Sequence, residues 1–66
     1  MKSRLRVLRA EFDWSQAELA DRVGVARQTI IALESGKYAP SLPLAYKLSK
    51  VFNKSVEEVF IPEPND

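Results

Sequence analysis

Residues 16–34 read QAELADRVGVARQTIIALE, and the spacing of small and apolar residues in this stretch decides the fold. Ala20 is small enough for two helix backbones to approach closely, and Gly24 suits the left-handed conformation of a tight turn. The positions that would seat a second helix against the first are Val25, Ile30 and Leu33. The stretch therefore predicts two helices joined by a tight turn, which is the helix-turn-helix arrangement.

The sequence before this stretch predicts one more helix. Leu5, Leu8 and Phe12 recur at helical spacing, and Ser3 stands where it could cap such a helix. The helix that begins the central stretch is opened by residues 15–18 (SQAE), which match a capping box. The next helix runs from Arg27 to about residue 35 and is closed by a glycine.

Two further helices are expected after the central stretch. Ser41 can cap the first of them, Pro43 is tolerated in its first turn, and Asn53 can end it. Residues 55–58 (SVEE) form a second capping box that opens a short helix ending near residue 60. The sequence thus predicts an all-α domain of five helices over residues 1–61. An extended, proline-containing acidic tail follows over residues 62–66. No alternating stretch is long enough to build a sheet of its own, and the tail could at most form a brief edge pairing.

The composition narrows the function. A chain of 66 residues makes one small domain, and the absence of Cys and His removes disulfides, thiolate zinc sites and the usual neutral-pH acid–base residue. Glu57 and Glu58 are adjacent and would point to different faces of their helix, so they do not form a catalytic pair. We therefore expect no enzyme, no cofactor and no metal. No apolar run is long enough to cross a bilayer and no signal peptide is present, so we expect a cytoplasmic protein.

The net charge is only +1, but the charges are segregated along the chain. Residues 22–54 carry six basic side chains and one acidic side chain, whereas residues 55–66 carry four acidic side chains and no basic one. This segregation indicates a middle that faces a polyanion and a separate acidic end, although an ordinary solvated surface would account for the same charges.

The helix expected from Arg27 onward has one face suited to DNA. At about 100° per residue, Arg27, Gln28, Ile31 and Ala32 fall on one side, opposite the apolar pair expected to be buried. Arg can bind guanine O6 and N7, Gln can bind adenine N6 and N7, and aliphatic groups can contact thymine methyls. An ordinary amphipathic helix would also be polar outside, but a water-facing Ile31 favours base reading.

Three segments resemble the xenobiotic-response-element (XRE) family of helix-turn-helix regulators, which includes phage repressors and Cro proteins. They are WSQAELA at 14–20, GVARQTI at 24–30 and ESGKYAPS at 34–41, and the likeness continues to residue 60. The resemblance implies a lambda-repressor-like domain and a sequence-specific DNA-binding transcriptional regulator, a repressor that binds a palindromic operator as a homodimer.

The resemblance also implies roles for particular residues. Gln16 resembles the family's phosphate-clamping glutamine, and the other expected phosphate contacts are Thr29, Lys37 and Tyr38. Arg9 and Glu34 match a pair that forms a structural salt bridge between the first and third helices. The chain departs from the family at Ala26, which removes a capping hydroxyl, and at Trp14, which we expect to be partly buried.

A dimer is expected because one helix that reads three or four base pairs cannot select a site among roughly 10⁶ competitors. The expected interface lies at the C-terminal end and comprises Val59, Phe60 and Ile61, although these residues could instead complete the monomer core. The alternative function is an antitoxin-like interaction module that masks a partner protein.

Overall fold

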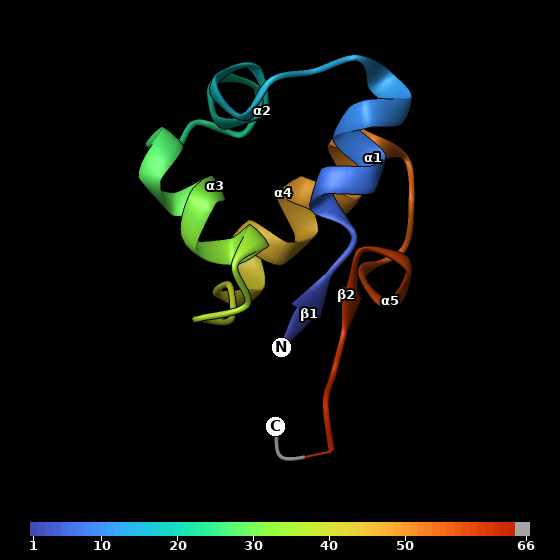
Figure 1. Ribbon diagram of the computed structural model, residues 1–66. Helices are drawn as coiled ribbons and strands as arrows, with labels where there is room; N and C mark the ends of the chain where they lie inside the picture. Colours follow the sequence, from blue (N-terminus) through green and yellow to red (C-terminus); the bar gives the residue numbers. More distant parts are fainter. Residues whose placement is uncertain (65–66) are drawn as a thin grey trace.

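The computed structural model describes residues 1–64, which form five helices and a two-stranded sheet (Figure 1). The elements in chain order are β1 (Lys2–Ser3), α1 (Leu5–Phe12), α2 (Gln16–Val23), α3 (Arg27–Glu34), α4 (Leu42–Phe52), α5 (Val56–Val59) and β2 (Phe60–Ile61). The five predicted helices are all present, and their order places α2 and α3 as the helix-turn-helix. No helix within residues 1–64 is long and apolar enough to cross a membrane.

Three serines begin helices as predicted. Each has an extended backbone and accepts a hydrogen bond from a backbone N–H three residues on; they are Ser15, Ser41 and Ser55. The reciprocal half of the capping box is formed by Glu58, which accepts from the Ser55 N–H at 2.9 Å. Glu18 instead pairs with Arg22 at 3.0 Å, so within residues 1–64 only the second predicted capping box is complete.

The prediction that Ser3 caps α1 is wrong. The helix begins one residue later, with Arg4 at the cap position, and no side-chain cap within residues 1–64 supports it. Ser3 lies in β1 instead, and its Oγ is buried without a hydrogen-bond partner among residues 1–64. The backbone of Arg4 donates to the Val59 carbonyl at 2.8 Å, so the start of α1 is held by the C-terminal segment.

The predicted all-α class is confirmed, and the structure adds one small sheet of two-residue strands. β1 and β2 pair antiparallel, with Lys2 opposite Ile61 and Ser3 opposite Phe60 (Figure 1). The ribbon stops at Pro62, which has no N–H to continue the ladder. Of the predicted tail, residues 62–64 lie outside the helices and strands and are exposed, and residues 65–66 lie outside the described residues.

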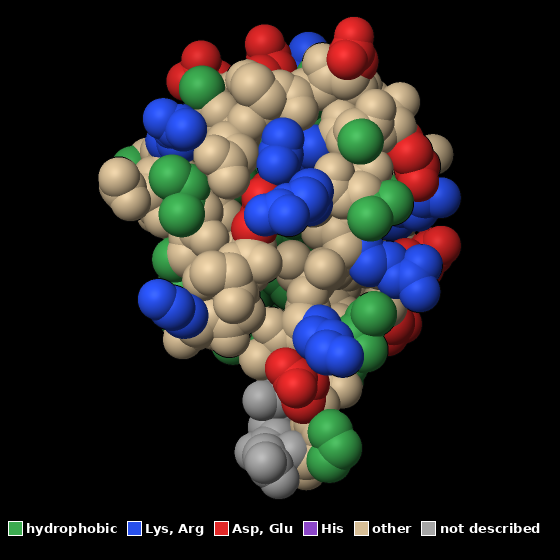
Figure 2. All heavy atoms as spheres, in the orientation of Figure 1, with side chains coloured by type: hydrophobic (Ala, Val, Ile, Leu, Met, Phe, Trp, Pro, Cys, Tyr) green, Lys and Arg blue, Asp and Glu red, His purple; other side chains and the backbone are tan. Residues whose placement is uncertain are grey.

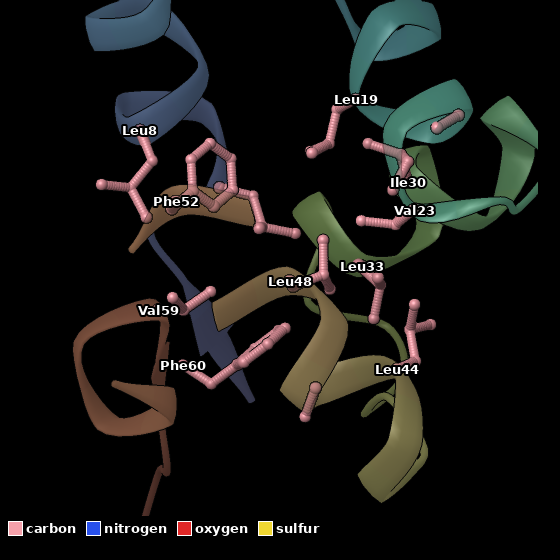
Figure 3. Packing of buried hydrophobic residues seen from close by; sticks show 13 residues of the cluster. Leu8, Leu19, Val23, Ile30, Leu33, Leu44, Leu48, Phe52, Val59 and Phe60 are labelled. Atoms are coloured by element: carbon pink, nitrogen blue, oxygen red, sulfur yellow. The ribbon is translucent and has the colours of Figure 1, made fainter. Parts of the chain in front are cut away.

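The core is built around α4. Leu48 is completely buried at its centre, with Leu33 of α3 on one side and Phe60 on the other (Figure 3). Phe52, one turn further along α4, is 1% exposed and packs its ring edge-on against Phe12, with 5.3 Å between centroids. Trp14 is partly buried as expected and covers the same end of the core. All five helices contribute to one apolar core.

Candidate nucleic-acid interface

The turn between α2 and α3 has the geometry that the spacing predicted. Gly24 has φ +74°, and Val25 donates its N–H to the Ala20 carbonyl at 3.0 Å, which closes the end of α2. Ala20 is 3% exposed, so its small side chain lies in the contact between helices. The turn therefore sets the angle at which α3 leaves α2.

The two faces of α3 differ in burial as the helical periodicity predicts. Ile30 and Leu33 are buried against the core (Figure 3). Arg27 and Gln28, in the first turn, are exposed. Ile31 and Ala32 are half-buried, so each side chain is less exposed than one that faces water completely. The accessible surface of α3 thus begins with an arginine and a glutamine and continues with two aliphatic side chains.

The N-terminus of α3 has no side-chain cap because Ala26 occupies the capping position. The backbone of Ala26 is extended and its carbonyl accepts a hydrogen bond from the Thr29 N–H at 3.0 Å. The backbone geometry of a helix start is therefore kept. Thr29 is half-buried beside this turn. The free backbone N–H groups at a helix N-terminus favour an anion, and phosphate is an anion.

Arg9 and Glu34 join α1 to α3 through a two-point ion pair. The Arg9 Nε lies 2.6 Å from Glu34 Oε2 and its Nη2 lies 3.0 Å from Oε1, while Nη1 donates to the Trp14 carbonyl at 3.0 Å. The Glu34 side chain is only 3% exposed and the Arg9 side chain 15% exposed. A paired guanidinium and carboxylate of this geometry bind firmly and hold the two helices in register.

The electrostatics of Glu34 follow from these contacts. Burial alone would raise the pKa of this carboxyl, but hydrogen bonds from Arg9 and Gln16 outweigh burial and hold its pKa below the usual value. The hydrogen bond to Glu34 likewise raises the pKa of Arg9. Arg6, whose Nε is 4.0 Å from the same carboxylate, adds a weaker attraction from the surface. Glu34 is therefore ionised at neutral pH.

Gln16 connects this ion pair to the exposed end of α3. Its Nε2 donates to Glu34 Oε1 at 3.2 Å, and its Oε1 accepts from the Arg27 Nη2 at 3.3 Å. The sequence reasoning missed the Gln16–Glu34 contact. The residues are 18 positions apart and on different helices, so no local pattern signals it.

Lys37 and Tyr38 follow α3 and are exposed, in the connection that leads to α4. Gly36, with φ +76°, turns the chain directly before them. Figure 2 shows Lys and Arg side chains spread over the face between α1 and α3, with acidic atoms beneath some of them. This face combines exposed cations with the open side of α3.

Two of the three residues expected at a dimer interface are buried in the apolar core of the single chain. Val59 is completely buried and Phe60 is 4% exposed, because both pack against α4 (Figure 3). Their burial agrees with the alternative that they complete the monomer core, whereas Ile61 is 37% exposed. An open apolar groove of about 290 Å³ is lined mainly by Met1, Pro40, Leu42, Ala45, Phe60 and Pro62.

Within residues 1–64, no group of three His, Cys, Asp or Glu side chains could hold a metal ion. What the described surface offers is a grouped set of hydrogen-bond donors on α3 and near its ends. This arrangement suits recognition of a polyanion by contact.

Comparison with known proteins identifies the family. Residues 5–59 match the model of the helix-turn-helix family. The chain is 56% identical over 61 residues to an uncharacterised HTH-type transcriptional regulator of Archaeoglobus fulgidus, covering 92% of this chain and 86% of that protein. It is 48% identical over the whole of both chains to another from Methanocaldococcus jannaschii.

A phage protein is similar as well. The transcriptional repressor RstR of the cryptic phage CTXphi, from Vibrio cholerae, is 37% identical over 57 residues, which are 86% of this chain and 51% of RstR. The resemblance inferred from the sequence is confirmed. The chain belongs to the XRE family of DNA-binding helix-turn-helix transcriptional regulators.

Proposed function

We propose that this protein is a repressor that binds a palindromic operator as a homodimer and reads it with α3 in the major groove. The observation that carries the proposal is the pair of exposed side chains, Arg27 and Gln28, on a helix whose other face is anchored by Ile30 and Leu33. Because its back is buried in the core, α3 can present these side chains rigidly to base edges. Similarity to the repressor RstR supports repression as the sign of regulation.

The base-reading residues in this proposal are Arg27, Gln28, Ile31 and Ala32. Arg27 donates one N–H to Gln16 and keeps further N–H groups for guanine, and Gln28 carries both a donor and an acceptor for adenine. The half-buried Ile31 and Ala32 supply short apolar surface for thymine methyls.

The phosphate contacts in this proposal flank the reading helix. Lys37 and Tyr38 are exposed after its C-terminal end, and Thr29 lies in its first turn. Gln16 stands at the start of α2, where free backbone N–H groups also attract phosphate. Contacts of this kind fix the register of the protein on the duplex without reading sequence.

A second copy of the chain is the proposed partner at the apolar groove that Met1, Leu42 and Phe60 help to line. Leu42 is 64% exposed and Tyr46 53% exposed on the same helix, so the groove continues into further apolar surface. Two copies joined there would present two α3 helices to one duplex. The operator would then be palindromic, with its half-site centres about 10 base pairs apart.

The test is a selection of binding sites from random duplexes, followed by binding titrations on the selected site. Arg27→Ala is expected to weaken binding to that site by about 1–3 kcal/mol and to relax one base position in each half-site. Arg22→Ala is the matched control, since it removes the same charge from α2, where Arg22 stacks on Trp14.

Three outcomes would contradict the proposal. Equal weakening of selected and random duplexes by Arg27→Ala would refute base reading. A selected motif without two-fold symmetry would refute the homodimer on a palindrome. Failure to enrich any duplex, together with co-purification of a small unrelated protein, would favour the masking module instead.

A further inference from the structure

The contacts around Gln16 form a chain of hydrogen bonds that leads from the interior to the reading face. Arg9 donates to Glu34, Gln16 donates to Glu34 through Nε2, and Arg27 donates to Gln16 through Nη2. The chain begins at a side chain that is 15% exposed and ends at an exposed one. It therefore links the structural ion pair to the first residue of α3.

The direction of every bond in this chain is dictated by chemistry. An ionised carboxylate only accepts hydrogen bonds and a guanidinium only donates them. Glu34 therefore requires the NH₂ group of Gln16 to face inward, which leaves the Gln16 oxygen facing Arg27. Since the Glu34 pKa is lowered, the carboxylate stays ionised at neutral pH and this orientation persists.

We propose that Glu34 is a positioning residue for base recognition: through the amide of Gln16, it determines that residue 27 meets an acceptor and so holds the Arg27 guanidinium at the reading face. This inference rests on the proposed function of Arg27. One N–H of the guanidinium is used by Gln16, which leaves four of its five, enough for a two-point contact with guanine. Gln16 acts here as a bridge, with one N–H remaining for a phosphate.

Glu34→Leu tests the inference because it keeps a similar side-chain volume and removes the acceptor of Gln16. In the wild type, Oε1 of Glu34 accepts from both Arg9 and Gln16, so an amide at position 34 could keep its oxygen there and leave Gln16 in place, whereas leucine cannot. Without the carboxylate, the NH₂ group of Gln16 is no longer held inward, and Arg27 loses its fixed partner. The preference for guanine at the base read by Arg27 is expected to fall about tenfold.

A double variant supplies the matched rescue. In Gln16→Glu/Glu34→Leu, both oxygens at position 16 are acceptors, so Arg27 meets an acceptor whichever way that side chain turns. The net charge equals that of the wild type. We expect the guanine preference to return to within about twofold of the wild type, even if the carboxylate at position 16 weakens binding to all duplexes alike.

The measured quantity is the ratio of affinities for the selected duplex and a duplex changed at that one base pair. This ratio does not depend on the folded fraction, because the same folded molecules bind both duplexes. A second readout uses the free protein. The side-chain NH₂ signals of Gln16 in NMR spectra are expected to shift and exchange faster in Glu34→Leu.

Several results would overturn the inference. One is a Glu34→Leu protein with lowered thermal stability and an unchanged guanine preference, since that would make Glu34 purely structural. Another is a folded double variant that does not recover the preference. Unchanged Gln16 signals would overturn it without any DNA. If Arg27→Ala itself relaxes no base position, the proposed function of Arg27 fails first, which distinguishes the two failures.

Discussion

Removing the guanidinium of Arg9 is the most informative single change for the stability of this protein. Arg9→Ala removes both hydrogen bonds to Glu34 and the one to the Trp14 carbonyl. Glu34, 3% exposed, would keep only Gln16 and the more distant Arg6 as partners. Breaking a buried pair by removing one partner costs about 3–5 kcal/mol, because an uncompensated charge stays buried.

We expect a cost of about 3 kcal/mol at pH 7, at the lower end of that range because the pair lies near the surface. For a domain of this size, that cost lowers the melting temperature by roughly 12–24 °C. The wild-type carboxyl has a lowered pKa, so its contribution to stability is present above about pH 4.3, the unfolded value, and is lost as the pH falls through the folded pKa.

In Arg9→Ala the effects that lower the Glu34 pKa are weakened. The hydrogen bond and the charge of Arg9 are lost while burial still penalises the ionised carboxyl, so the stability that the wild type gains as this carboxyl ionises is expected to shrink. The difference in unfolding free energy between wild type and variant is therefore expected to grow from pH 3 to pH 7. It is measured by urea unfolding followed by circular dichroism at several pH values.

The matched control is Arg6→Ala. Like Arg9→Ala, it removes one positive charge from α1 that lies near the Glu34 carboxylate. The Arg6 side chain is 81% exposed and 4.0 Å from Glu34, so we expect a cost below about 1 kcal/mol. A cost for Arg9→Ala that is equal at pH 3 and pH 7, or equal to that of Arg6→Ala, would refute the reasoning.

Three further predictions test the core, the turn and the DNA contact. Val59→Ala is expected to lower the free energy of unfolding of the monomer by about 2 kcal/mol, because Val59 is completely buried. Sedimentation should show an unchanged dimer dissociation constant, and a weaker dimer would show that Val59 contributes to the interface. Gly24→Ala is expected to lower the free energy of unfolding by about 1–2 kcal/mol. The space around Gly24 is open, so the cost comes from its left-handed backbone, with φ +74°. Thermal melting measures the loss, and an unchanged melting temperature would refute the backbone strain. Lys37→Ala is expected to weaken all duplexes alike and to reduce the salt slope of binding by about 0.9, and an unchanged slope would count against a phosphate contact.

The helices could be predicted from sequence because their signals are local. Ser41, Asn53 and the capping box opened by Ser55 act within one or two turns of their own position, and each begins or ends a helix where expected. The burial of Ile30 and Leu33 followed from periodicity alone, for the same reason. The same periodicity predicted that Arg27 and Gln28 would be exposed.

Ser3 shows where local signals mislead. A serine two residues before an apolar repeat resembles a helix cap, but the backbone there pairs with residues 60–61 at the other end of the chain. Two-residue strands have too few side chains to show an alternating pattern, so neither β1 nor β2 could be recognised. Phe60 belongs to this ribbon as well as to the apolar core, so its burial depends on contacts that are distant in sequence.

The sequence by itself determined the helix-turn-helix, the polarity of α3 and the family, because these depend on residue spacing within single helices and turns. Only the tertiary structure decided that the amide of Gln16 joins Glu34 to Arg27, and that Val59 and Phe60 complete the monomer core. Such contacts join residues that are distant in sequence. They arise only when packing against α4 fixes the helices relative to one another.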